Sequence, residues 1–575
     1  MSSKNILVVT ASLIILLIIQ SCGGKEVIKN PADMVLMNGI IATVEDENPS
    51  AEAIAVKDGK IFAVGSTNEI KKNVGDSTKV IDLKGKFVMP GFNDSHAHFL
   101  GIGNSKQILD LHEAKNWDEV ITIVAKAADT TKPGEWIIGR GWHQEKFNPK
   151  PMPNVNGYPV HNELSRASPH NPVMLIHASG HAVFANAKAM QVAGINRNTP
   201  DPIGGTIERD SLGNAIGVFE ENAENLIRKH YDEYLAQRTP KQILDNYEKQ
   251  VKLASDDCLK KGVISCADAG ETFDVLDILK KFADEKKLSV RLNVMIGDSP
   301  VNMKKKLKDY FLIGYGDNSL TVRSVKQYID GALGSRGAWM LEPYSDLPDH
   351  SGSNVTSLSM LKEISELAIM NGFQMRIHAI GDRGNREVLN IYEEVFKKHP
   401  DKKSLRWGIE HAQHLSAQDI PRFAQLGIFA AMQGVHCTSD ATFVPERIGN
   451  MRAEEGAYVW KKLIDSGATI CNGTDAPVED VDPIKCFYSS VTRKNATGMV
   501  FYGDQKMSRL EALRSYTING AYASFEENIK GSIKAGKFAD FVVLSNDLLN
   551  CPDDQILNTK VLYTIVGGKI LYKSE

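Results

Sequence analysis

Short apolar runs alternate with amphipathic helical patterns through the middle of the chain. This alternation is typical of repeated strand–helix units whose strands form a buried parallel sheet. The candidate strands are Phe87–Phe92, Trp136–Gly139, Val173–His177, Val263–Cys266, Leu292–Ile296, Val322–Ile329, Gln374–His378, Trp407–His411, Ile428–Met432 and Thr469–Cys471. They outnumber the eight strands of a closed (β/α)8 barrel, so we expect one or two to belong to an insertion. The proline-rich, polar region around residues 145–250 is where we place it.

Strand-like runs separated by turns also occupy both ends of the chain. Ala53–Val56 near the N-terminus and Phe541–Leu544 near the C-terminus are examples. Two all-β ends around a mixed middle predict one composite β-sandwich, built from residues 33–90 and 525–575. Residues 91–524 are then left for the strand–helix units and their insertion.

The first residues have the pattern of a targeting segment. Ile6–Ile19 is an apolar run, too short to cross a bilayer comfortably but suited to the core of a signal peptide. The run ends in Ile19 and is followed by Gln20, the small residue Ser21 and Cys22, which resembles the lipobox of bacterial lipoproteins. We therefore expect residues 1–21 to be removed and Cys22 to carry lipid, which would place the protein at the bacterial cell envelope, facing the periplasm. An uncleaved N-terminal anchor is the alternative.

Composition narrows the functional classes further. The chain has 575 residues, 42% of them hydrophobic, and 67 Lys and Arg against 71 Asp and Glu give a net charge of −4. A nucleic-acid partner is not expected without a basic excess. The cysteines contain no C-x-x-C pair, so neither a zinc knuckle nor a disulfide framework is indicated; they are Cys22, Cys258, Cys266, Cys437, Cys471, Cys486 and Cys551.

Metal-ligand side chains stand where several strands end. His96 and His98 follow an apolar run with a spacing of two, which points both imidazoles to the same side of a strand. His378, His411 and Asp475 each end, or follow, a later apolar run. In a closed barrel the C-terminal strand ends meet at one face, where active sites lie. We therefore expect these five residues to face one pocket.

Lys326 lies within another apolar run. A free ammonium inside a barrel is costly unless it is paired or chemically changed. One interpretation is that CO₂ converts this amine to a carbamate, carboxylysine, whose two oxygens can bridge two metal ions. The other is a structural ion pair with Asp330 or another acid in the barrel.

Together the motifs resemble the amidohydrolase superfamily, and more narrowly the bacterial group that includes N-substituted formamide deformylase. The resemblance covers almost all of the chain after residue 33. The matching stretches are Val88–His98, Val325–Arg336, Ile377–Gly384, Ile409–Gln413, Gly473–Val478 and Gly531–Asp540.

The resemblance implies a (β/α)8 TIM barrel with a composite β-sandwich and two divalent metal ions, expected to be zinc. In this implied site His96 and His98 bind the buried metal, which Asp475 completes, and Lys326 bridges as a carbamate. His378 and His411 bind the second metal. The implied reaction is hydrolysis of a C–N amide-type bond of a small molecule, not a peptide bond in a protein, by a metal-bridging hydroxide. Asp475 would be the catalytic base.

Substrate contacts are harder to locate. In the group that this chain resembles, the regions of Trp142, His143, His177 and His181 line the substrate side, although structural roles are equally open for them. Arg336 could receive a substrate carboxylate or support the loop after Lys326. The same site could also cleave a cyclic amide, an amidine or an ester, or belong to a catalytically silent substrate-binding lipoprotein. An oligomer is compatible with the sequence.

Overall fold

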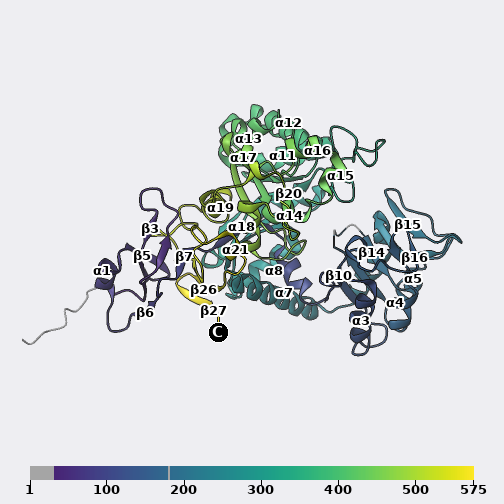
Figure 1. Ribbon diagram of the computed structural model, residues 1–575, viewed down its shortest axis with the longest axis horizontal. Coiled ribbons are helices and arrows are strands. Elements are labelled where there is room, and N and C mark those ends of the chain that lie inside the picture. The colour runs from purple at the N-terminus through teal and green to yellow at the C-terminus, as the bar shows by residue number, and fades with distance from the viewer. Residues whose placement is uncertain (1–30, 179, 181) are drawn as a thin grey trace, which may run out of the picture.

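The computed structural model describes residues 31–178, 180 and 182–575 (Figure 1). The predicted signal peptide over residues 1–21, the lipid anchor at Cys22 and the candidate His181 lie outside the described residues and stay predictions. Among the helices that are described, none is long and apolar enough to cross a membrane.

A sheet of eight parallel strands forms the centre of the molecule and confirms the predicted (β/α)8 barrel. Its strands follow the chain in spatial order: β8 (Phe92–Ala97), β17 (Val263–Glu271), β18 (Arg291–Ile296), β20 (Leu320–Tyr328), β21 (Gln374–Ala379), β22 (Gly408–His411), β23 (Phe429–Gln433) and β24 (Thr469–Gly473). The first and last strands meet, because the N–H of Asp475 donates to the carbonyl of His96 (2.7 Å). Beside this bond the Thr474 hydroxyl donates to the Asp94 carboxylate (2.6 Å).

Amphipathic helices cover the outside of this sheet, among them α7 (Pro240–Lys260), α8 (Phe273–Asp284), α11 (Leu358–Met370) and α12 (Asp382–Lys398). In α12 the buried Val388, Tyr392 and Val395 recur every three or four residues, which places them on one helical face. The ring of Tyr392 packs edge-on against Trp407, with centroids 4.8 Å apart. This packing fixes β22, the strand that carries His411.

The two ends of the chain build one neighbouring β structure, which lies at one end of the molecule (Figure 1). It consists of two sheets, in the orders β5-β4-β1-β6 and β27-β26-β25-β7-β2-β3. Their strands are β1 (Met34–Met37), β2 (Ile40–Ala42), β3 (Ser50–Ala51), β4 (Ala53–Lys57), β5 (Lys60–Gly65), β6 (Lys79–Asp82), β7 (Phe87–Pro90), β25 (Phe541–Leu544), β26 (Val561–Val566) and β27 (Lys569–Lys573). Strand β25 from the C-terminal segment pairs antiparallel with β7 from the N-terminal segment.

A further sheet stands apart from the barrel at the other end of the molecule (Figure 1). We call it, with its helices, the insertion module; its sheet order is β15-β16-β14-β13-β10-β9. The strands are β9 (Leu109–Asp110), β10 (Ile137–Trp142), β13 (Val173–His177), β14 (Ala182–Ala185), β15 (Gly205–Arg209) and β16 (Ala215–Glu221). All of them lie between β8 and β17 in the sequence.

The insertion module begins earlier in the chain than residue 145. Trp136–Gly139, interpreted above as a barrel strand, overlaps β10, and β10 pairs with β13 in the separate sheet. Both strands are buried on two faces: Ile137 packs with Trp117 on one side, and Ile138 packs with Ile227 on the other. Helices cover both faces of this sheet, so its strands are as apolar as barrel strands and hydrophobicity alone does not separate them.

Candidate active site

The early histidine pair and the last-strand acid meet at the C-terminal rim of the barrel. His96 is buried, whereas the His98 side chain keeps 35% of its surface exposed. One carboxylate oxygen of Asp475, Oδ1, lies 3.4 Å from Nε2 of His96 and 3.3 Å from Nε2 of His98. These contacts hold the pKa of Asp475 well below its usual range, although burial opposes the shift.

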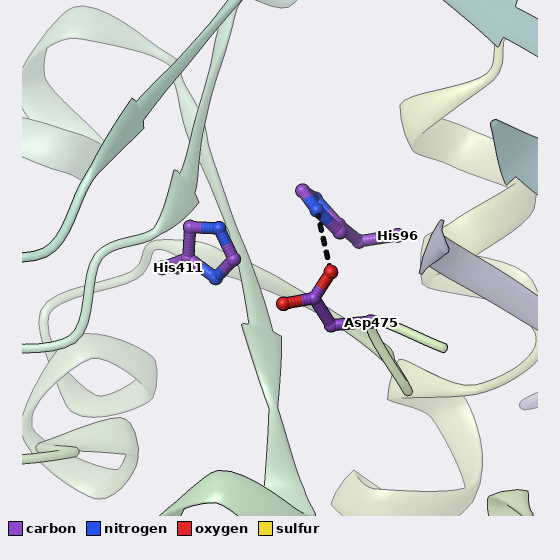
Figure 2. A group of neighbouring side chains, drawn as sticks. All are labelled: His96, His411 and Asp475. Carbon is purple, nitrogen blue, oxygen red and sulfur yellow. Dashed lines mark ion pairs between the residues drawn. The ribbon is translucent and has the colours of Figure 1, made fainter. Parts of the chain in front are cut away.

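The two late histidines complete the cluster. The ring centroid of His411 lies 4.7 Å from that of His96 and 4.5 Å from that of His378. His96, His411 and Asp475 each offer one ligand atom, all within 4.8 Å of one another (Figure 2). Burial lowers the pKa values of His378 and His411 far below the usual value, so both imidazoles stay neutral with lone pairs available. Neutral imidazole and carboxylate are the ligand types that zinc binds.

Lys326 is buried against this cluster, with 1% of its surface exposed. Its Nζ makes no hydrogen bond to any described residue and lies 5.0 Å from the ring centre of Tyr328. Burial lowers the pKa of its amine to about 8, although the charges of Glu410 and Asp475 oppose the shift. An unpaired amine with a reduced pKa is the form that reacts with CO₂.

Asp330 is not the ion-pair partner of this lysine. Its carboxylate accepts hydrogen bonds from the backbone N–H groups of Ile380 (3.0 Å), Gly381 (2.8 Å) and Trp339 (2.9 Å). It also lies 3.6 Å from Nε2 of His378. Asp330 therefore ties the loop after β21 to the end of β20, and the ion-pair interpretation of Lys326 loses the partner named for it.

Sequence reasoning missed Glu410, which contacts Nδ1 of His96, and Arg376, which contacts Glu410. One oxygen of the fully buried Glu410 contacts Nδ1 of His96, and the other contacts Nε of Arg376. Arg376 also donates to the carbonyl of Ser95 (2.7 Å). With Nδ1 engaged, Nε2 of His96 faces Asp475, as a metal ligand requires. The signal in the sequence is a charged residue inside each of two apolar strands.

Backbone strain is concentrated at the same rim. His411, Ala412 and Asp475 have φ values of 70°, 43° and 56°, in the left-handed region that non-glycine residues rarely adopt. Each such conformation costs on the order of 1–3 kcal/mol and persists only where the surroundings impose it. Two of these residues, His411 and Asp475, are among the side chains that meet at the rim.

Unpaired polar atoms support metal binding here. Besides Lys326, the buried Nε2 atoms of His378 and His436 have no hydrogen-bond partner among the described residues. His436 Nε2 lies 3.9 Å from the second oxygen of Asp475. Buried polar atoms without partners are costly, and a cation bound among them would remove that cost. The donor set therefore fits a metal centre.

Two of the predicted substrate-contacting residues belong to the interior of the insertion module. Trp142 is fully buried, and its indole N–H donates to the carbonyl of Leu175 (2.9 Å). His177 packs edge-on against Trp142, and its Nε2 is 3.1 Å from Oε1 of Gln144. His143 lies beside His177, with ring centroids 4.5 Å apart. Trp142 has no surface to offer a substrate, which corrects the role considered for it.

Arg336 is already bound to a carboxylate of the protein. Its Nε and Nη2 donate to the two oxygens of Asp346 (3.2 and 2.8 Å), and Arg447 contacts the same acid. The guanidinium therefore supports the loop after Lys326, which is the second of the two roles considered above. It is not free to bind a substrate carboxylate.

The C-terminal rim of this parallel barrel carries imidazoles, a carboxylate and a buried amine. These features are typical of metal-dependent hydrolases. A model of the "Amidohydrolase family" matches residues 79–572, and the chain belongs to this family. It is 33% identical to Protein LONG AFTER FAR-RED 3 of Arabidopsis thaliana (94% of this chain, 92% of that protein). It is 28% identical to N-substituted formamide deformylase of Arthrobacter pascens (94% and 98%).

Among solved structures, the fold is similar to that of an uncharacterized metal-dependent hydrolase from Pyrococcus horikoshii OT3. The TM-score is 0.73 and the identity 28%, over 91% of this chain and 99% of that one. The chain is therefore a hydrolase, and the resemblance that its motifs predicted is confirmed.

Proposed function

We propose that this protein hydrolyses a C–N amide-type bond of a small molecule, using two divalent metal ions, zinc being the expected metal. The observation that carries the proposal is the convergence of four histidines, Lys326 and Asp475 at one barrel rim. Three of these residues already offer ligand atoms within 4.8 Å of one another. The similarity to N-substituted formamide deformylase supports an amide-type bond.

In this proposal Lys326 would be a carbamate and, together with the histidines and Asp475, would hold the metal ions. Its neutral amine attacks the carbon of CO₂, and the nitrogen then loses one proton, which leaves an anionic carbamate with two oxygens. The unpaired Nζ and the lowered pKa support this chemistry. The carbamate would also remove the cost of burying an ammonium without a partner.

The bound metals would supply a nucleophilic water near neutral pH and polarise the substrate carbonyl. Asp475 would accept a proton from the attacking water and pass it to the leaving nitrogen. Its two oxygens suit the task, because Oδ1 faces His96 and His98 while Oδ2 faces His436. Glu410 and Arg376 keep His96 in the tautomer that leaves Nε2 available.

Metal analysis and product analysis test this function together. Purified protein should contain close to two ions per chain, and a panel of small N-substituted formamides and acetamides should give free amine and acid. No bound metal would overturn the mechanism. Cleavage restricted to cyclic amides, amidines or esters would support the proposed site but show that it acts on a different bond. Metal uptake without turnover would favour a silent binding protein, against which the presence of all six ligand residues argues.

We also propose that Cys22 anchors the protein to the bacterial cell envelope, as the lipobox-like segment suggests. Expressed at full length, the protein should appear in the membrane fraction, and mass spectrometry should find a lipidated N-terminal Cys22. The Cys22→Ala variant should not be lipidated. Recovery of a chain that still begins at residue 1 would favour the uncleaved anchor.

A further inference from the structure

The side chain of Gln433 contacts His411 at the C-terminal rim of the barrel. Gln433 is the last residue of β23, and it points to the same side of this strand as Ala431, because residues two apart on a strand share a side. Only 2% of its surface is exposed. Its Oε1 lies 2.7 Å from Nδ1 of His411, and its Nε2 donates to the carbonyl of Ala431 (3.2 Å). The amide therefore makes one hydrogen bond through each end.

The bond to Ala431 determines which end of the amide faces the histidine. A backbone carbonyl can only accept, so it takes a proton of the NH₂ group of Gln433, and the amide oxygen is left for His411. An oxygen acceptor requires a proton on Nδ1. In a neutral imidazole the other nitrogen, Nε2, then carries the lone pair that can bind a metal. The contact with Gln433 thus selects the tautomer in which His411 offers Nε2 as a ligand.

His96 and His411 have partners of different charge. Nδ1 of His96 contacts the carboxylate of Glu410, which also binds Arg376. Nδ1 of His411 contacts a neutral amide instead. A carboxylate behind a metal-bound imidazole fixes its orientation and raises its basicity, whereas an amide supplies the orientation without a formal charge. The response of His411 to a changed partner can therefore be predicted from the charge of that partner.

We propose that Gln433 is a positioning residue for His411, which holds the imidazole in the tautomer and orientation that bind metal. The inference rests on the proposed metal centre, but not on the bond that the enzyme hydrolyses. It predicts that metal affinity requires a hydrogen-bond acceptor at position 433, and that an anionic acceptor serves at least as well as the amide. If Gln433 only stabilised the fold, metal affinity would instead follow the stability of the protein.

Two substitutions of Gln433 separate these roles. Gln433→Met keeps the length of the side chain and removes both hydrogen bonds, so the affinity for one of the two ions should fall about 10- to 100-fold. Gln433→Glu keeps an acceptor for Nδ1 of His411 but places a carboxylate against the carbonyl of Ala431. It should therefore lower the stability of the metal-free protein and still bind zinc at least as tightly as the wild type.

Gln374 offers a matched control at the opposite rim. It is the first residue of the barrel strand β21 and, like Gln433, is 2% exposed. Its Nε2 donates to the carbonyls of Arg406 (2.6 Å) and Ala523 (3.0 Å). Gln374→Met therefore also removes the hydrogen bonds of a buried amide. It should lower the stability of the metal-free protein and leave the zinc affinity of the wild type unchanged.

Competition with a chelator of known affinity measures zinc binding, and chemical denaturation of the metal-free proteins measures stability. Wild-type affinity in Gln433→Met would overturn the inference. So would zinc binding by Gln433→Glu that is no tighter than by Gln433→Met, or an affinity that falls with stability in all three variants. Gln433→Asn, whose amide is one methylene shorter, replaces Gln433→Met if that variant does not fold.

The same measurements distinguish this inference from the proposed function. If the wild type binds zinc but hydrolyses no amide, the proposed reaction fails, and the zinc affinities of the variants still decide the role of Gln433. If the wild type binds no zinc, both proposals are overturned. If the wild type hydrolyses amides and Gln433→Met binds zinc as the wild type does, only the role of Gln433 is overturned.

Discussion

The two rims of the barrel differ in whether their polar groups are paired. At the N-terminal rim, Arg291 donates through two nitrogens to Asp540 (2.7 and 3.1 Å), and Lys530 donates to Ser265 (2.5 Å). At the C-terminal rim, Lys326 and His378 keep buried nitrogens without a hydrogen-bond partner among the described residues. One rim uses its charges to join the barrel to the β-sandwich, and the other leaves ligand atoms available. The barrel thus has stabilising charge pairs at its N-terminal rim and candidate ligand atoms at its C-terminal rim.

The largest effect should follow from a change at the C-terminal rim. Asp475→Asn removes the proposed base and keeps the volume of the side chain, so turnover should fall about 10³- to 10⁴-fold. Steady-state kinetics on a hydrolysed substrate would measure the loss. Circular dichroism should show an unchanged fold, and metal analysis should still find bound ions. Near wild-type turnover would rule out Asp475 as the base.

A change at the N-terminal rim should lower the stability of the protein and leave its catalysis unchanged. Asp540→Ala leaves the largely buried Arg291 without its partner, which should lower the free energy of unfolding by about 3 kcal/mol. Chemical denaturation would measure this change. Metal content and kcat of the folded variant should match the wild type. A loss of metal in Asp540→Ala would mean that the two rims are coupled.

A smaller effect is expected from the support behind His96. Glu410→Gln keeps a side chain of similar shape but removes the anion that contacts Nδ1 of His96. Metal affinity should fall about 10- to 100-fold, as for other outer-shell partners of metal-binding histidines. Competition with a chelator of known affinity would measure it. If affinity is unchanged, Glu410 serves only Arg376.

The smallest expected effect is a pH dependence of stability that arises near the C-terminal rim. Burial and the charge of Arg452 lower the pKa of His414 to about 3. Its ordinary value is about 6.5, so below this pH the unfolded chain binds the proton first and the folded state loses stability as pH falls. The contribution at pH 5 is about 1–2 kcal/mol. Unfolding of His414→Gln should therefore depend less steeply on pH between 6.5 and 5; an identical slope would contradict the assignment.

The sequence predicted that these side chains lie together at one rim, because their positions at strand ends follow from the apolar runs. His98, His378 and Asp475 could be recognised since each stands at or just beyond the end of an apolar run. Glu410 and Arg376 carried a weaker signal, as charges inside apolar strands. The structure brings all five to one rim.

The insertion module was harder to predict from its sequence. Its strands β10 and β13 are apolar on both faces, so they were indistinguishable from barrel strands. The pairing of Arg336 with Asp346 depends on an irregular segment without periodicity. Such pairings are decided by tertiary structure and leave no local pattern.

The hydrogen bond between Asp475 and His96 has a consequence for how the protein is made. If the proposed metal centre is right, the ribosome delivers its first ligand, His96, long before its last, Asp475, and the two become neighbours only when the eighth strand takes its place beside the first. A nascent chain that lacks this strand has an incomplete centre, so full metal loading must wait until synthesis has passed residue 475. Truncated translation products should therefore neither retain the full complement of ions nor carry out premature hydrolysis.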